Sequence, residues 1–260
     1  MIKLSFLCLA FATLTCGLFP KSNPVIRKEL REQNGREGEY MFIDGIKVHE
    51  TDPEKQPQPP VVQPKPYDAK AAKPPKGAVV LFDGTKETLG NWQAGNGGPT
   101  KWKLIEGALE SVRGGGYLIS KQEFGSCRLH IEFATPKVAK GSGQGRGNSG
   151  LYQIDMYENQ ILDSFGSDGI HNECGGIYSN KDSLVNASFP PLTWPTYDIE
   201  ITNAKSPNGK KIKNARITSR LNGIVIHENF AIPRKTGGAR SDPEGTPGSI
   251  KLQGHGNPLQ

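Results

Sequence analysis

The sequence lacks, in the whole region after residue 76, the hydrophobic period of about 3.6 residues that marks amphipathic helices. Only 35% of its 260 residues are hydrophobic, whereas it contains 32 glycines and 20 prolines. This composition disfavours a helical bundle and is typical of a β protein with many turns. The length allows one large all-β domain or two small ones.

The sequence also lacks an apolar run long enough to span a bilayer. The run from Leu4 to Leu14, preceded by Lys3, has the length and charge of a signal peptide. We therefore predict that residues 1–20 are an export signal, and that the protein is periplasmic, in the cell envelope or extracellular. Cys16 loosely resembles the lipidated residue of a lipoprotein signal, so cleavage to a free protein and lipid anchoring both stay open. Membrane attachment is expected only through the N-terminus.

Cysteine is scarce. Two of the four, Cys8 and Cys16, lie in the predicted export signal, which leaves Cys127 and Cys174. This pair could form one disulfide in an oxidising compartment. Alternatively, both are buried thiols, because free cysteine is among the most buried residue types. No histidine adjoins either of them in sequence, so neither is predicted to be a nucleophile.

Nucleic-acid binding motifs are missing as well. The net charge is +6, but no Arg/Lys-rich element interleaved with aromatic residues is present. Part of the excess is carried by Lys65, Lys70, Lys73 and Lys76, which favours a solvated basic segment. The glycine-rich stretch 137–147 has no Gly-Lys-Ser/Thr ending, which argues against a phosphate-binding loop. No nucleic-acid partner is expected.

Proline, lysine and glutamine dominate residues 51–76. Such a segment cannot bury enough apolar surface to order itself, so residues 21–76 are predicted to be a polar, disordered linker. Within it, Tyr40–Val48 could form a hairpin around Asp44-Gly45. The globular domain is predicted over residues 77–260.

Alternating apolar and polar residues predict β-strands throughout that domain. The pattern is clear at 127–133 and 194–202, and a hairpin is predicted at 102–110. Asn222-Gly223 between two alternating runs is the strongest hairpin signal in the chain. A two-sheet β-sandwich is the natural architecture.

Residues 146–164 are the most unusual stretch. Alternation from Met156 to Leu162 places Glu158 and Gln160 on one face of a strand and Tyr157 and Asn159 on the other. A buried strand rarely carries Glu and Gln on one face unless they are paired or line a cleft. We interpret this stretch as a functional site.

Ordered short motifs connect residues 79–258 to a known family. They are Leu81-Phe82-Asp83-Gly84, Trp92, Trp102 with Glu106-Gly107, Glu132-Phe133, Gly147–Tyr152, Tyr157–Asp163, Cys174–Tyr178, Trp194–Asp198, Asn222-Gly223 and Leu252–Pro258. In these residues the chain resembles the 3-keto-disaccharide hydrolase family. The resemblance implies a concanavalin/laminin-G-like jelly roll. Family members usually continue past His-Gly-Asn-Pro into one more strand, so either this chain is truncated or its sheet has an open edge.

The resemblance implies cleavage of glycosides that carry a ketone at sugar C3. That ketone acidifies the C2 hydrogen, so a base can remove it, the enolate can expel the C1 substituent, and water can add. Such a reaction needs a base, an enolate stabiliser and a proton source. A divalent cation could polarise the ketone.

The catalytic candidates are Glu158, Glu132 and His255. Glu158 is the preferred base, although it could be an ion-paired structural residue. Glu132 could face the same cleft or solvent, and His255 could be a solvated terminal residue. The substrate-binding candidates are Arg146, Asn148, Gln160, Trp194, Tyr197 and Gln253. Either aromatic residue could instead pack in the core. If a metal is bound, Glu158, Asp163 and His255 are its candidate ligands.

Two other functions remain open: a non-catalytic carbohydrate-binding module on a proline-rich stalk, and a structural envelope protein. The observation that discriminates between these functions is whether Glu132, Glu158, Gln160 and His255 converge on one concave pocket. Carbohydrate is the expected partner of the enzyme and of the binding module.

Overall fold

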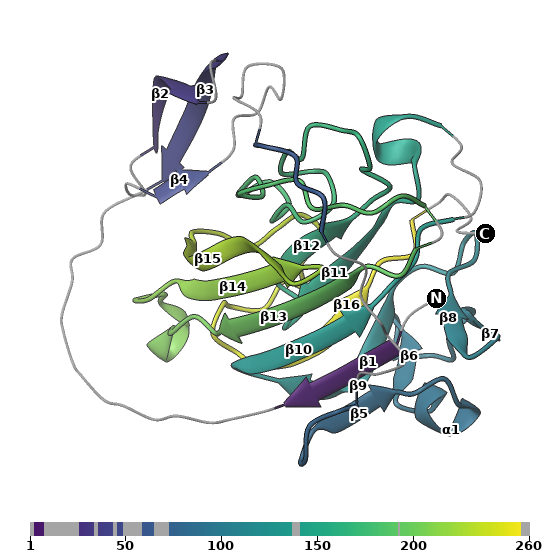
Figure 1. Cartoon of the computed structure of the whole chain (residues 1–260). Helices are drawn as coiled ribbons and strands as arrows, with labels where there is room; N and C mark the ends of the chain where they lie inside the picture. The colour runs from purple at the N-terminus through teal and green to yellow at the C-terminus, as the bar shows by residue number, and fades with distance from the viewer. Residues whose placement is uncertain are drawn as a thin grey trace.

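Two antiparallel sheets form the body of the computed structural model (Figure 1). The structure describes residues 3–7, 26–33, 36–43, 46–48, 59–64, 73–136, 141–191 and 193–255. The six-stranded sheet contains, in spatial order, β15 (Ile224–Ile232), β14 (Ala215–Leu221), β13 (Thr196–Thr202), β10 (Cys127–Glu132), β1 (Lys3–Leu7) and β5 (Val79–Phe82). The five-stranded sheet contains β12 (Tyr157–Ile161), β11 (Ser149–Gln153), β16 (Gly248–Leu252), β9 (Leu118–Phe124) and β6 (Trp92–Ala94). The predicted all-β sandwich is confirmed.

The core lies between these sheets and follows the alternation in the sequence. Leu129 and Ile131 on β10 are 2% and 0% exposed. Leu118, Leu151 and Leu252 of the other sheet are buried with them in the same cluster. Arg128 and His130 point the other way because successive side chains of a strand alternate between faces.

Two predicted hairpins are confirmed. β14 and β15 are joined by Asn222 and Gly223, whose φ angles of 54° and 78° are those of a type I′ turn. Glu106 and Gly107, at 50° and 78°, join β7 (Lys103–Ile105) to β8 (Ala108–Glu110) in the same way. Short helical turns complete the domain: α1 (Lys86–Leu89), η2 (Gly143–Gly145) and η3 (Pro207–Gly209). Among the described residues, no helix is long and apolar enough to span a membrane.

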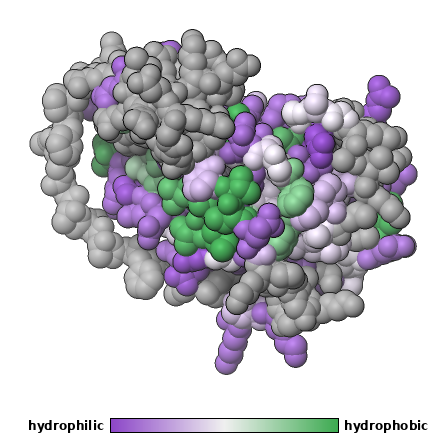
Figure 2. Space-filling model, turned by 45° about the horizontal axis from the view of Figure 1, so that its top comes forward, coloured by the Kyte–Doolittle hydropathy of each residue, from purple (hydrophilic) through white to green (hydrophobic). Residues whose placement is uncertain are grey.

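The segment before the domain also contains strands. β2 (Ile26–Gln33), β3 (Arg36–Ile43) and β4 (Ile46–Val48) form a separate three-stranded sheet, and β3 with β4 is the hairpin expected around Asp44-Gly45. Further along, Val61 forms a parallel bridge with Asn186, so residues 59–64 lie against the domain. Val61 and Leu184 remain 55% and 46% exposed. The face shown in Figure 2 carries an apolar group bordered by hydrophilic side chains.

β1 comes from the segment predicted to be an export signal. It lies between β10 and β5 and is antiparallel to both (Figure 1). Residues 3–7 pair with residues 128–132, whereas β5 has no other strand neighbour in the described part of this sheet. The N-terminal segment therefore connects β5 to the rest of the sheet.

Cys127 and Cys174 are buried thiols and do not form a disulfide with each other. The Cys174 Sγ lies 3.4 Å from the Tyr197 hydroxyl. Burial raises the pKa of Cys174, so its thiol stays protonated at neutral pH.

Candidate active site

One row of side chains crosses all five strands of the smaller sheet on the face turned away from the core, here called the outer face. Strand register aligns Gln93, Ile119, Lys251, Tyr152 and Glu158 in that order. Directly paired residues on neighbouring strands point to the same face. The adjacent row contains Leu118, Leu252 and Leu151, which are core residues, so the row with Glu158 faces outwards.

Glu158 is the titratable centre of this row. Its side chain is buried, with 3% of the residue exposed. Burial raises the pKa of Glu158 to about 7, while the neighbouring Tyr152 hydroxyl and the charge of Lys251 act in the opposite direction. A carboxyl group with this pKa can both accept and return a proton near neutral pH.

Lys251 lies in the same row on the other side of Tyr152 and is held firmly there. Its Nζ donates a hydrogen bond of 2.6 Å to the Gly238 carbonyl and forms an ion pair with Asp155. The same ammonium lies 4.5 Å from the ring centre of Tyr117 and 4.1 Å from that of Tyr152. Cation–π contacts of this kind stabilise a lysine that has left water.

The turn at Gly237-Gly238 covers part of the row. The Tyr152 hydroxyl donates to the Gly237 carbonyl over 2.8 Å. Gly238 has a φ of 76°, and a Cβ there would lie 2.9 Å from the hydroxyls of Tyr117 and Tyr152. Only glycine allows the backbone to come this close to both rings.

A network of amide groups surrounds Gln160, which lies two residues along β12 from Glu158 and on the same face. Gln144 Oε1 accepts hydrogen bonds from Asn148 Nδ2 at 2.9 Å and from Gln160 Nε2 at 3.0 Å. The Asn172 carbonyl accepts from both Gln144 and Gln160. Gln160 Oε1 is buried and has no hydrogen-bond partner among the described residues. This oxygen can accept a hydrogen bond from a hydroxyl of a bound ligand. The predicted residues Asn148 and Gln160 do lie together, because both donate to Gln144.

Arg146 and Asp163 are paired with each other. Arg146 donates to the same Asp163 oxygen from Nη2 at 2.6 Å and from Nε at 3.2 Å. Asp163 is therefore engaged by a cation, and the expected metal ligand set of Glu158, Asp163 and His255 is not assembled. Across the described residues, no three His, Cys, Asp or Glu side chains could hold a metal ion together.

Glu132 was expected to share a cleft with Glu158, and the structure corrects this. Glu132 lies on β10 in the other sheet. It is 3.6 Å from His130 Nε2, and His130 Nδ1 is 2.7 Å from Asp198. Burial lowers the pKa of His130, but its bonds to Asp198 and Glu132 outweigh this and raise it to about 9. Glu132 thus belongs to a cluster of ion pairs on the six-stranded sheet, whereas Glu158 lies on the five-stranded sheet.

Of the two aromatic substrate-binding candidates, Tyr197 takes the alternative that the sequence left open and packs in the core. Tyr197 is fully buried, and its ring centre lies 5.0 Å from that of Phe133. Its hydroxyl donates to the Gln160 carbonyl over 2.6 Å, so it links the two sheets instead of stacking on a ligand. Trp194 is partly exposed.

Gln253 and His255 follow β16. The Gln253 backbone continues the pairing with β11: its N–H donates to Gly150, and its carbonyl accepts from Ser149 Oγ. His255 is exposed and has no described contact with Glu158. Of the four residues expected to converge, only Glu158 and Gln160 share the outer face.

Sequence reasoning missed Lys251, Tyr152 and Gln144. A lysine between Ile250 and Leu252 was a usable signal, because both neighbours are core residues and the lysine must face away from them. Gln144 gave no signal, since it lies in a glycine-rich loop whose position is set by tertiary contacts.

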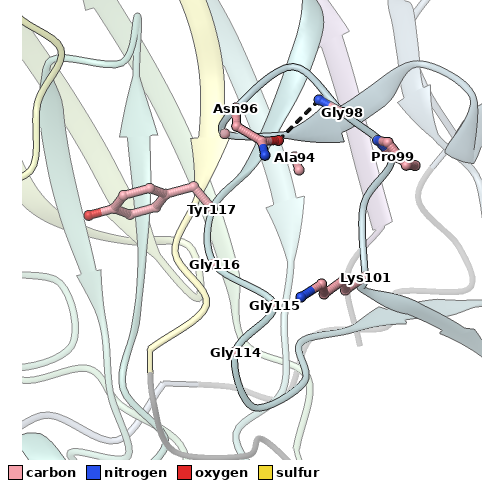
Figure 3. A pocket seen from close by; sticks show the side chains of 10 residues that line it. Ala94, Asn96, Gly98, Pro99, Lys101, Gly114, Gly115, Gly116 and Tyr117 are labelled. Carbon is pink, nitrogen blue, oxygen red and sulfur yellow. Dashed lines mark hydrogen bonds between the residues drawn. The ribbon is translucent and has the colours of Figure 1, made fainter.

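A cavity of about 340 Å³ lies beside the row. Residues from the segments 94–101 and 114–117 line it (Figure 3). The Tyr117 ring extends from its wall towards the neighbouring strands, and Lys101 points across it towards Gly115.

The chain is similar to one known protein family and to solved structures. Residues 77–260 match the family model of the 3-keto-alpha-glucoside-1,2-lyase-like domain. A crystal structure from Parabacteroides distasonis ATCC 8503, described as a "putative glycosyl hydrolase", has 33% identity and a TM-score of 0.67, covering 78% of this chain and 87% of that one. A second structure from that organism, with the same description, has 18% identity and a TM-score of 0.49, with coverage of 69% and 88%. Curated proteins give no match.

Proposed function

Because the chain belongs to the 3-keto-alpha-glucoside-1,2-lyase-like family, we propose that it cleaves glycosides oxidised to a ketone at C3, with Glu158 as the base. The observation that carries this proposal is the position of Glu158: a buried carboxyl group, turned away from the hydrophobic core, whose pKa is raised to about 7. Strongly shifted pKa values concentrate at functional sites.

Glu158 first removes the proton from C2, which the C3 ketone has acidified. The electron pair forms the enolate and then expels the oxygen of the leaving group as the C1–O bond breaks. The proton held by Glu158 passes to that oxygen. Water then adds across the C1–C2 double bond, with its hydroxyl at C1 and its proton at C2, so the net reaction is hydrolysis.

The neighbouring groups support this assignment. The charge of Lys251 lowers the pKa of Glu158 and so favours the ionised form that acts as a base. The unpartnered Oε1 of Gln160 can accept a sugar hydroxyl, and Gln144 and Asn172 fix its orientation. Since Glu158 is only 3% exposed, substrate binding requires neighbouring segments to move.

Release of the aglycone from a 3-keto glycoside tests the proposal, with the unoxidised glycoside as substrate control. We expect Glu158→Gln to lower the rate by about 10²- to 10⁴-fold, the usual contribution of a general base. The matched control is Glu132→Gln, a buried carboxyl on the other sheet, which should leave the rate unchanged. A parallel assay with chelator reports any need for a metal.

Unchanged release by a folded Glu158→Gln variant would remove Glu158 from the mechanism. If no 3-keto glycoside is cleaved but carbohydrate still binds, a non-catalytic binding module is the better description.

We further propose that the reaction takes place outside the cytoplasm, because residues 1–20 have the pattern of an export signal. N-terminal sequencing of protein from fractionated cells checks this. A cytoplasmic protein that begins at Met1 contradicts it.

A further inference from the structure

The position that β1 occupies between β10 and β5, here called the strand slot, has walls that other contacts hold in place (Figure 1). On one side, β10 is paired with β13 along its whole length. On the other side, β5 is tied to the five-stranded sheet, because the Leu81 carbonyl accepts a hydrogen bond of 2.9 Å from Trp92 Nε1 at the start of β6. Without β1, the two walls would therefore stay apart and leave a gap one strand wide.

Both walls of the strand slot offer backbone hydrogen-bonding groups. β1 is antiparallel to β10 from Lys3 opposite Glu132 to Leu7 opposite Arg128, and it is antiparallel to β5 as well. A strand edge whose N–H and C=O groups are unpaired is a template for a further strand. An extended occupant that runs in the direction of β1 satisfies the edge groups of both walls at once.

The inner side of the strand slot selects apolar residues. Positions 4 and 6 of β1 stand opposite Ile131 and Leu129, which are 0% and 2% exposed and belong to the core. On the other wall, Phe82 is 1% exposed and also stands opposite position 4. Because directly paired residues on neighbouring strands share a face, the occupant must carry apolar residues at alternate positions.

The outer side of the strand slot has an excess of negative charge at one end. Glu132 is 5% exposed and forms one cluster with His130 and Asp198, in which two carboxylates share a single histidine. A basic residue opposite Glu132 balances this cluster better than a neutral or acidic one. The register places Lys3 at that position.

We propose that the strand slot is a binding site for an extended peptide with a basic residue opposite Glu132 and apolar residues at alternate positions after it. Its occupant is the export segment of this chain, whose Lys3, Leu4 and Phe6 fit that pattern. The segment fills the slot as β1 while it is attached to the domain. Removal of the signal, as proposed above, opens the slot, and the segment then binds only as a separate peptide.

Fluorescence anisotropy with a labelled peptide of residues 2–7 tests this site. The slot is opened in two ways: by Ser5→Pro in the full chain, because proline inside a strand blocks its pairing, and by using the exported form without residues 1–20. We expect the peptide to bind both open forms at least about tenfold more tightly than the wild-type full chain, whose tethered β1 competes at high effective concentration. Lys47→Pro, a proline in β4 of the separate sheet, is the matched control and should behave like wild type.

The peptide sequence is tested in the same assay. A peptide that carries Ser5→Pro should bind the open forms about tenfold more weakly, the effect of one lost backbone hydrogen bond. A peptide that carries Lys3→Glu should also bind more weakly, because it brings a like charge to Glu132. Equal affinity of all three peptides, or equal affinity for the wild-type and open forms, would overturn the proposal.

Folding of the open forms is followed by circular dichroism. Where they are folded, absence of peptide binding overturns the proposal. Where they are unfolded, refolding with the peptide of residues 2–7 should restore the β-sheet signal and refolding with the proline peptide should not. Refolding that neither peptide restores, or that both restore equally, also overturns it.

Discussion

The carboxylate of Glu158 lies directly over Gly150 on the neighbouring strand. A Cβ added at position 150 would overlap Glu158 Oε1, and the other atoms of the carboxyl end are also in contact range. Because Gly150 has no side chain, β11 leaves the space in which the carboxylate of Glu158, the proposed base, lies.

Replacing Gly150 by alanine should displace this carboxylate. Because Glu158 is buried, it cannot move freely, and we expect at least about a tenfold loss of kcat for 3-keto glycosides, since small displacements of a catalytic group cost up to about 100-fold. Gly125→Ala is the control, because a Cβ there meets no atom within 4 Å. Unaltered kcat in a folded Gly150→Ala variant would show that the position of Glu158 is not critical.

The pH dependence should report the ionisation of Glu158. The base is active when ionised, so kcat/KM should rise with pH through about 7 and level off above it. The charge of Lys251 lowers this pKa, so Lys251→Met should move the midpoint to higher pH. Lys121→Met, an exposed lysine on β9 of the same sheet, should not. A midpoint that moves to lower pH, or no ionisation near 7, contradicts the assignment.

The same buried carboxyl should cost stability. Its pKa is about 7 in the folded protein and 4.5 as a model value for the unfolded chain. Between these values the folded state binds more protons, so stability falls as the pH rises from about 4.5 to 7. The pKa difference corresponds to about 3 kcal/mol at most. We expect Glu158→Gln to raise the free energy of unfolding at pH 8 but not at pH 4, as measured by urea denaturation at both values. Equal effects at the two pH values would show that Glu158 titrates normally.

Strand β1 should support the six-stranded sheet only in a protein that keeps its N-terminal segment, because cleavage of the proposed export signal would remove β1. Deleting residues 1–20 leaves β5 without its strand neighbour and exposes one edge of β10. We expect Tm to fall by at least about 5 °C, because 1 kcal/mol shifts Tm by roughly 2–4 °C in a domain of this size. Deleting residues 21–50, which contain β2, β3 and β4, is the control and should change Tm little. If the two deletions have equal effects, β1 does not support the domain.

Local rules predicted much of the fold. Asn222-Gly223 forms its hairpin because positive φ angles are accessible to these two residues and match the twist of the flanking strands. Glu158 and Gln160 share the outer face because the side-chain period of a strand is two. Both outcomes depend only on residues near each other in sequence.

The remaining site residues could not be assigned in that way. Alternation shows which residues of a strand share a face, but not which sheet the strand joins, so Glu132 was grouped with Glu158 although β10 belongs to the other sheet. Tyr197 fits both a core position and a ligand platform by its pattern alone. Its burial between the sheets was decided by β13 packing against Gln160.

The sequence by itself determined the all-β class, the hairpins, and the unusual strand face that carries Glu158, because periodicity and turn chemistry act within a few residues. Only the tertiary structure decided that Lys251 and Tyr152 lie in one row with Glu158, that β1 lies between β5 and β10, and that a cavity opens next to Tyr117. These arrangements depend on the register between strands far apart in the chain, and a pattern along one strand carries no information about that register.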